Sequence, residues 1–92
     1  MNQLRSKSIY IGEDVLYTSC ESGIVLLNLE RGEFYHLDAV GGRMWTLLLE
    51  YSDISRAASI LATEYDYDEH SIKNDIQTIV KELCDSGLLI EG

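Results

Sequence analysis

Length, composition and charge exclude several classes of protein. The 92 residues contain no proline and 46% of them are hydrophobic, so we expect one domain over residues 1–92, with a loosely ordered N-terminus at residues 1–10. Sixteen acidic and seven basic residues give a formal net charge of −9, which argues against nucleic acid or an anionic membrane as partner, and no apolar run approaches the about 20 residues that span a bilayer, so we expect a cytoplasmic protein.

The first half of the chain predicts three strands. Hydrophobic and β-branched residues dominate residues 15–19, 24–29 and 34–37, and short turns with Gly23 and Gly32 separate these stretches. Connections this short force neighbouring strands to pair antiparallel, as a three-stranded meander. The third strand then lies at an edge of the sheet.

The second half predicts three helices. Asp38 suits the N-cap of a helix from residue 39 to about residue 50, and the adjacent Gly41 and Gly42 near its start indicate a close approach of another backbone. A second helix begins near residues 52–53, and a third spans residues 68–85 and ends before Gly87. Strands followed by helices predict an α+β, winged-helix-like fold, with a three-stranded antiparallel sheet followed by three helices.

We expect no catalytic residue, metal ion or cofactor. His36 and His70 are the two histidines, and neither has the spacing of a metal-binding pair. Cys84, His36 and Asp38 contain the chemistry of a nucleophile, a base and an orienting acid, but Cys84 falls near the buried face of the third helix, where it fills space.

Three further binding functions are weighed against the sequence. A calcium loop beginning at Asp66 fails because Ser71 stands where the sharp turn requires glycine. A DNA-binding third helix fails because acidic residues outnumber its lysines. An acyl or peptidyl carrier protein stays as an alternative, because residues 85–88 resemble a phosphopantetheine attachment site, although Ser86 follows a helix instead of opening one.

One continuous segment resembles the signature of PqqD-like proteins. Residues 27–45 read LNLERGEFYHLDAVGGRMW, which contains a strand, a turn glycine, an aromatic pair, Leu-Asp, a glycine and an aliphatic-Trp pair. Asp75, Leu83 and the Gly-Leu-Leu at residues 87–89 are similar to the family's closing helix and its end. The resemblance covers about residues 13–90, and it departs at Leu37-Asp38, where the family often has Leu-Asn.

This resemblance implies a non-catalytic RiPP recognition element that captures the leader of a ribosomally synthesised precursor peptide by β-strand addition. It implies further that the chain is similar to the stand-alone member of lasso-peptide pathways, which delivers the leader to a separate modifying enzyme, a cysteine protease. The alternative within the family is a PqqD-type peptide chaperone for a radical SAM enzyme in cofactor biosynthesis.

The residues themselves also suit peptide capture, since an edge strand offers unpaired backbone groups to an extended peptide. Strand alternation places Phe34 and His36 on one face and Tyr35 and Leu37 on the other, without indicating which pair faces the helices. On the third helix, isoleucines are expected to form the apolar wall, with a charged rim, of a groove between this helix and the edge strand, although isoleucines at this spacing are more often core. The candidate leader-binding residues are Glu33, Phe34, Tyr35, His36, Leu37, Ile72, Lys73, Asp75, Ile76 and Ile79.

Overall fold

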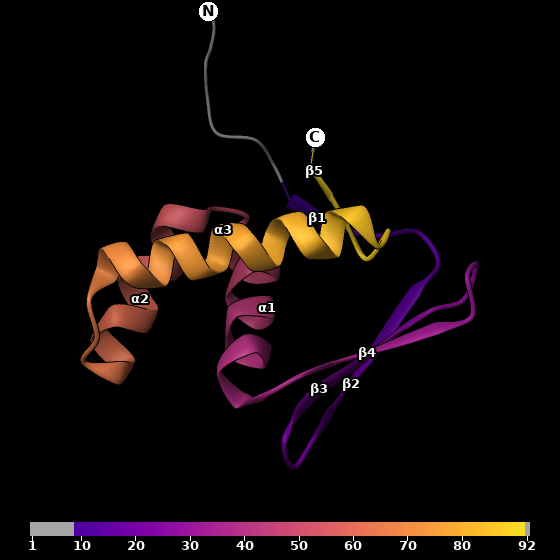
Figure 1. The fold of residues 1–92 in the computed structure, drawn as a ribbon, viewed down its shortest axis with the longest axis horizontal. Coiled ribbons are helices and arrows are strands. Elements are labelled where there is room, and N and C mark those ends of the chain that lie inside the picture. Colours follow the sequence, from indigo (N-terminus) through magenta and orange to yellow (C-terminus); the bar gives the residue numbers. More distant parts are fainter. Residues whose placement is uncertain (1–8, 92) are drawn as a thin grey trace, which may run out of the picture.

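The computed structural model describes residues 9–91, and within them the strands and helices follow one another as Figure 1 shows. Four strands come first, then three helices, then a short last strand. These elements are β1 (Ile9–Ile11), β2 (Val15–Cys20), β3 (Gly23–Asn28), β4 (Glu33–Leu37), α1 (Ala39–Tyr51), α2 (Ile54–Tyr65), α3 (Glu69–Asp85) and β5 (Leu89–Glu91).

The predicted three-stranded antiparallel sheet is confirmed. Its strand order is β2-β3-β4, with both pairs antiparallel. Leu26 faces Tyr17 on one side and Tyr35 on the other, and it is fully buried, so this row lies on the inner face of the sheet, against the helices. The neighbouring row, which contains Leu27, lies on the opposite face because side chains alternate along a strand.

A second, two-stranded sheet was not predicted. β1 pairs antiparallel with β5, and Ile9 is buried within it. Ile9 and Tyr10 therefore form a strand, where a loosely ordered N-terminus was expected, while residues 1–8 of that expectation lie outside the described part of the chain. Two strands of three residues each are too short to show a hydrophobic period, so only the tertiary pairing reveals them.

Aspartates cap the start of each helix. The predicted N-cap Asp38 accepts a hydrogen bond from the backbone N–H of Gly41 at 2.8 Å, and Asp53 and Asp68 cap α2 and α3 in the same way, so α3 begins one residue later than predicted. Gly87 follows α3 with φ of +76°, the left-handed conformation that favours glycine at a helix end. Within residues 9–91, the helices are all too short or too polar to cross a membrane.

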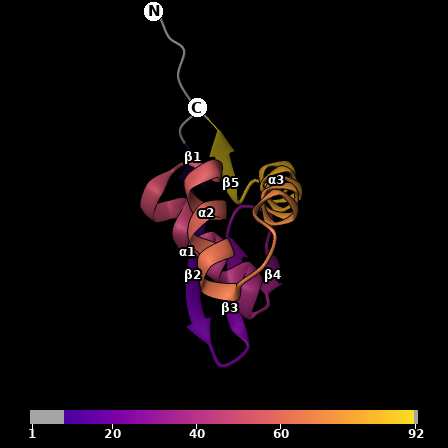
Figure 2. The same ribbon diagram turned by 90° about the vertical axis from the view of Figure 1, so that its left-hand side faces the viewer.

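The core lies between the inner face of the sheet and the helices. α1 crosses this face, and a Cβ added at Gly42 would lie 3.1 Å from Cγ1 and 3.5 Å from the backbone N of Ile24, so α1 packs closely on β3 at this glycine. Trp45 on the next turn of α1 is fully buried. α3 packs beside α2, and Figure 2 shows it almost end-on, on the side of the molecule where β4 lies.

Candidate functional site

One edge of the three-stranded sheet is unpaired and lies beside α3. Within residues 9–91, β4 pairs only with β3, so its second edge carries no strand. Figure 2 shows β4 on the same side of the molecule as α3. The predicted edge strand is therefore present, and it lies next to the helix that the sequence analysis paired with it.

The register shows which backbone groups point to this free edge. The N–H of Leu29 donates to the carbonyl oxygen of Asp14 at 2.8 Å, which fixes the odd-numbered residues of β3 as those bonded to β2. Its even-numbered residues then bond to β4, because hydrogen-bonded positions alternate along an antiparallel ladder. The N–H and C=O groups of Phe34 and His36, opposite odd-numbered residues of β3, are consequently free.

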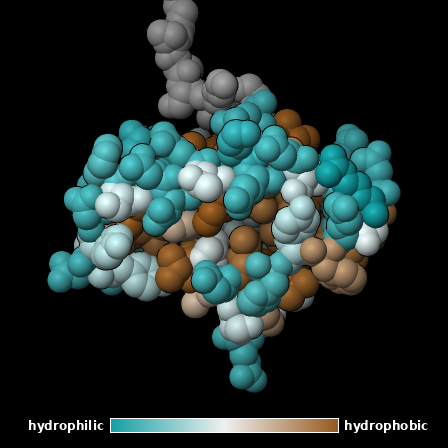
Figure 3. Space-filling model, in the orientation of Figure 1, coloured by the Kyte–Doolittle hydropathy of each residue, from teal (hydrophilic) through white to brown (hydrophobic). Residues whose placement is uncertain are grey.

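A groove begins where β4 ends and runs along α3. Two open hollows of about 310 and 350 Å³ adjoin each other, and Val40, Met44 and Asp75 line both of them. The first also includes Asp38 and Ile79, next to the end of β4. We call the two hollows together the helical groove, and in Figure 3 apolar atoms follow a hollow beneath the polar surface of α3.

The far part of the helical groove lies at the turn between α2 and α3. There Tyr65, Tyr67 and Ile72 line the larger hollow with Val40 and Met44. The lining is therefore mostly apolar and aromatic, with Asp75 at its middle. Ligand sites typically combine such walls with a few polar groups that fix orientation.

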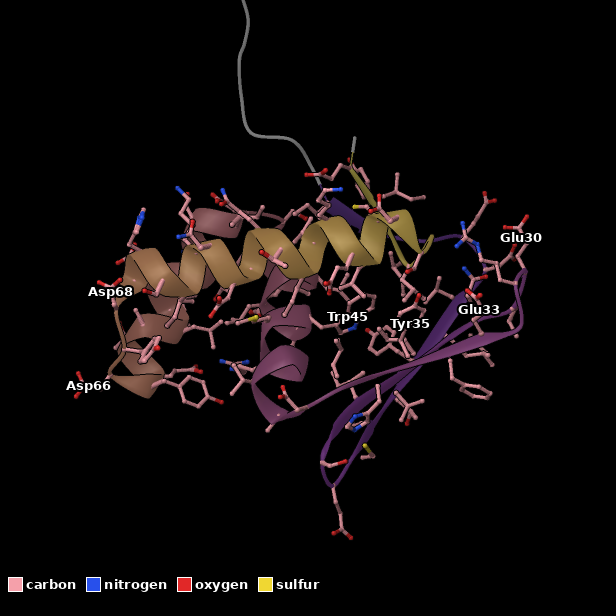
Figure 4. The ribbon with its side chains drawn as sticks, in the orientation of Figure 1. Glu30, Glu33, Tyr35, Trp45, Asp66 and Asp68 are labelled. Atoms are coloured by element: carbon pink, nitrogen blue, oxygen red, sulfur yellow. The ribbon has the colours of Figure 1, made fainter. Side chains whose placement is uncertain are left out.

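The middle of β4 and the segment before it are tied to the end of α3. The hydroxyl of Tyr35 lies 2.5 Å from Oγ of Ser86, Nδ2 of Asn28 donates to the Ser86 carbonyl oxygen at 3.1 Å, and Nη1 of Arg31 donates to the Asp85 carbonyl oxygen at 3.5 Å. Figure 4 shows Tyr35 close to Trp45, between the sheet and α3. The furrow expected between β4 and α3 thus lies instead between α1 and α3, continuing from the end of β4.

The structure separates the predicted residues of β4 into two sets. Tyr35 and Leu37 face the helices and are partly buried against the core. Phe34, 71% exposed, and His36 face the other side of the sheet, where Nε2 of His36 lies 3.0 Å from Oγ of Ser22. Glu33 is exposed at the start of the strand, at the end away from the groove.

The predicted residues of α3 also separate. Ile72 and Asp75 line the larger hollow, and Asp75 and Ile79 line the smaller one. Ile76 is fully buried in the core, so it has no exposed surface that could contact a peptide. Lys73 lines a different hollow with Ile9 and residues at the start of α2, on another side of α3. The helix period explains this, because positions 73 and 75 are about 200° apart around an α-helix.

Several groove residues were missed by the sequence analysis. Val40 and Met44 follow the apolar spacing of the first predicted helix, which indicates core. Met44 is buried, as that spacing predicts, but Val40 is 41% exposed, and both line the helical groove. Tyr65 and Tyr67, at the end of α2 and in the turn after it, are large exposed apolar residues. Two tyrosines in an acidic turn were a usable signal, since tyrosine combines an apolar ring with a polar hydroxyl and is enriched at interfaces.

The electrostatics of the described residues do not favour a nucleophilic cysteine. Burial raises the pKa of the Cys84 thiol, and the nearby carboxylates of Glu91 and Asp85 raise it further. A raised pKa keeps the thiol protonated, whereas a reactive cysteine requires a thiolate. Within residues 9–91 there is also no group of three or more His, Cys, Asp and Glu side chains that could hold a metal ion.

Comparison with known families agrees with this geometry. The family model described as "Coenzyme PQQ synthesis protein D (PqqD)" matches residues 23–89, which is well over half of the chain. The chain belongs to the PqqD family. The resemblance found in the sequence of this PqqD protein is thereby confirmed, and no curated protein matches it.

Three solved structures share the fold of this PqqD protein. "TbiB1 in Complex with the TbiA(beta) Leader Peptide" is 30% identical, covers 86% of this chain and 92% of that one, and has a TM-score of 0.80. "Lasso peptide synthetase B1 complexed with the leader peptide" is 22% identical, covers 90% and 98% of the two chains, and has a TM-score of 0.84, which shows likeness of fold. The third is a solution structure of the PqqD truncation of Methylobacterium extorquens PqqCD, described as a stand-alone RiPP recognition element; it is 25% identical, covers 90% and 88%, and has a TM-score of 0.67.

Proposed function

We propose that this PqqD protein binds the leader of a ribosomally synthesised precursor peptide and presents it to a separate modifying enzyme. The observation that carries the proposal is the unpaired edge of β4 leading directly into the helical groove. An extended peptide added to β4 would pair with the free groups of Phe34 and His36 and then place side chains along α3. Among the relatives, TbiB1 was solved with a leader peptide and shares 30% of its residues with this chain.

The available contacts are sufficient for useful affinity. Two residues with free N–H and C=O groups offer four hydrogen bonds, each contributing about 0.5–1.5 kcal/mol net. One or two apolar anchors in the helical groove would add about 1.5–3 kcal/mol each, before the free energy of ordering the peptide is subtracted. Micromolar affinity requires only about −8 kcal/mol, so the edge and the groove can supply it together, whereas neither reaches it alone.

The charge of the groove indicates which leaders it accepts. Asp38 and Asp75 line the hollow nearest β4, and neither hollow of the helical groove is lined by a lysine or an arginine. A leader that combines apolar anchors with a lysine or arginine opposite Asp75 would complement this lining. An acidic leader would be repelled, given the formal net charge of −9.

For the enzyme that is served, we favour the cysteine protease of a lasso-peptide pathway. Two of the structural relatives were solved with leader peptides: TbiB1, which is 30% identical, and a protein described as lasso peptide synthetase B1. The second candidate is a PqqD-type chaperone for a radical SAM enzyme in cofactor biosynthesis, which the family description favours. The free edge of β4 and the helical groove would suit leader binding for either enzyme.

The carrier-protein alternative receives no support from the geometry around Ser86. This serine caps the C-terminal end of α3 and does not open a helix. Its hydroxyl is engaged with Tyr35, in a partly buried position. A phosphopantetheine arm on this oxygen would break the bridge between β4 and α3.

Fluorescence anisotropy tests the proposal, with the labelled leader of a precursor peptide that is encoded next to the gene of this protein. We expect saturable binding at micromolar concentration or tighter, and no binding of a scrambled leader of equal length and charge. Equal binding of the authentic and the scrambled leader, or no binding at tens of micromolar, would refute capture by this site.

A further inference from the structure

The side of the sheet that faces away from the helices is apolar and uncovered. The register places Leu16, Leu27 and Phe34 in one row across the three strands and Thr18, Val25 and His36 in the next. We call these six residues the outer sheet face. Leu16 is 57% exposed and Phe34 71%, although cross-strand rows of large apolar residues are normally buried by a second layer.

No described element supplies that second layer. α1 is the helix that packs on β3 and β4, and it does so on the inner face, where Ile24 meets Gly42. The β1-β5 pair forms a separate sheet. The outer sheet face is therefore an unfilled half of a sandwich within residues 9–91.

Acidic residues lie at both ends of the same strands. Four exposed carboxylates lie in the turn before β2 and in the two hairpin turns, and they are Glu13, Asp14, Glu21 and Glu30. Arg31 is the one basic residue in these segments, and its guanidinium is directed to the carbonyl of Asp85 on α3. The border of the outer sheet face is thus strongly negative.

This charge distribution selects among possible occupants. A second copy of the chain would bring two acidic borders together, and a nucleic acid or an anionic membrane would be repelled by them. A protein surface with an apolar centre and lysines or arginines around it is complementary in both respects. Such a partner would be steered by the long-range field and held by the apolar rows.

We propose that the outer sheet face docks the modifying enzyme, through an apolar patch of that enzyme bordered by basic residues. The inference rests on the proposed function, because it names the second partner of the same recognition protein. It assigns the two partners to different surfaces: the leader to the β4 edge and the helical groove, and the enzyme to the opposite side of the sheet.

The two surfaces meet at β4, which couples them. A leader strand added to β4 would alternate its side chains, and those not directed toward the helices would lie beside Phe34 and His36. The bound leader would therefore extend the outer sheet face by one strand. An enzyme docked there would contact both the protein and the peptide, so each partner would raise the affinity for the other.

Biolayer interferometry tests whether the enzyme docks on the outer sheet face. The partner is a purified cysteine protease encoded next to the gene of this protein. Leu16→Ser is the informative variant, because Leu16 lies on β2, two strands away from the leader edge. We expect it to weaken protease binding about tenfold or more while leader affinity, measured by anisotropy, stays within about twofold of wild type. Ile90→Ser, at a 48% exposed apolar residue of the separate β1-β5 sheet, is the matched control and should change neither affinity.

A second variant addresses the acidic border. Glu30→Lys should slow association with the protease and reduce the dependence of the rate on salt, with dissociation nearly unchanged. For the wild-type protein, a saturating concentration of leader peptide should increase the affinity for the protease.

Each alternative outcome leads to a definite conclusion. Unchanged protease affinity in Leu16→Ser, or absence of protease binding to wild type, would overturn the docking inference while leader binding still supports the proposed function. A wild-type dimer in sedimentation that Leu16→Ser dissociates would also overturn it, in favour of a second copy. Failure of the leader to bind wild type would refute the proposed function itself.

Discussion

The hydroxyl of Tyr35 lies 2.5 Å from Oγ of Ser86, and this contact joins the middle of β4 to the end of α3. The side chains of Asn28 and Arg31 reach the backbone of the same helix end. These three links fix one end of the space between sheet and helices. The helical groove opens at the other end, so the position of these links would decide the direction in which a peptide added to β4 leaves the strand.

Removing the Tyr35 hydroxyl should lower stability without affecting the groove. We expect Tyr35→Phe to reduce the free energy of unfolding by about 0.5–1.5 kcal/mol, the usual net contribution of one hydrogen bond. Urea unfolding of Tyr35→Phe, Ser86→Ala and the double variant measures this. The double variant should be hardly less stable than either single one, because both delete the same contact; full additivity would show that the two hydroxyls do not interact.

Proline on β4 should distinguish the free edge from the paired one. The N–H of His36 points to the free edge, so His36→Pro should retain the fold while it removes one donor and places a ring where an added strand would lie. We expect leader affinity to fall about tenfold or more. His36→Ala is the matched control, because it removes the side chain and its contact with Ser22 but keeps the N–H.

The contrary results for β4 are equally clear. If His36→Pro and His36→Ala bind the leader equally well, the free edge plays no part in peptide capture. If His36→Pro is unfolded by circular dichroism, Phe34→Pro provides the same test at the second free position, since its N–H also points away from β3.

The secondary structure was predictable because its signals are local. The meander, the three helices and the cap at Asp38 follow from alternation, periodicity and a side chain that bonds within one turn. The β1-β5 pair was not predictable, because each strand has three residues and the two are at opposite ends of the chain.

The site was only partly predictable because burial depends on tertiary packing. Ile72, Ile76 and Ile79 share one face of α3, and their spacing cannot tell that Ile76 is fully buried while Ile79 borders an open hollow. In the same way, alternation on β4 could not tell which pair faces the helices. In both cases the position of the residue relative to α1 determines its burial. The sequence of α3 or of β4 alone does not contain that information.

Truncating the two isoleucines should separate core from groove. Ile76→Ala should lower the free energy of unfolding by about 2–5 kcal/mol, because it leaves a cavity at a fully buried position. Ile79→Ala should be milder in stability and should weaken leader binding. Chemical denaturation and anisotropy on the same preparations compare the two. A larger loss of stability in Ile79→Ala than in Ile76→Ala would contradict this assignment.

The cap of α3 predicts a pH dependence of stability. Hydrogen bonds from the backbone N–H and then the hydroxyl of Ser71, at 2.9 and 3.0 Å, lower the pKa of Asp68. A carboxyl with a lowered folded-state pKa stabilises the fold fully above its unfolded pKa, about 3.9, and this is lost as the pH falls through the folded value. The stability gap between wild type and Asp68→Ala should therefore be largest near neutral pH and shrink below that pKa. Asp68→Asn, which keeps an acceptor without an ionisable group, should show a smaller gap at neutral pH but the same decrease with falling pH, because only the wild-type carboxyl titrates. A gap independent of pH would contradict this role of the Asp68 carboxylate.

Of two charged residues on α3, Asp75 should contribute to leader binding and Lys73 should not. Asp75 lies where the two hollows of the helical groove meet, whereas Lys73 lines a hollow elsewhere on the helix. Asp75→Lys should weaken leader affinity about tenfold or more, because it places a bulky cation in an apolar groove that otherwise suits a basic leader residue.

Lys73→Glu is the matched control for Asp75→Lys, with a charge change of equal size two residues away on the same helix. It should leave leader affinity within about twofold, apart from the general effect of a more negative protein, which salt screens. Titrations at low and high salt separate these contributions. Comparable losses in both variants at high salt would mean that the peptide lies across the Lys73 side of α3, and would remove the helical groove from the binding site.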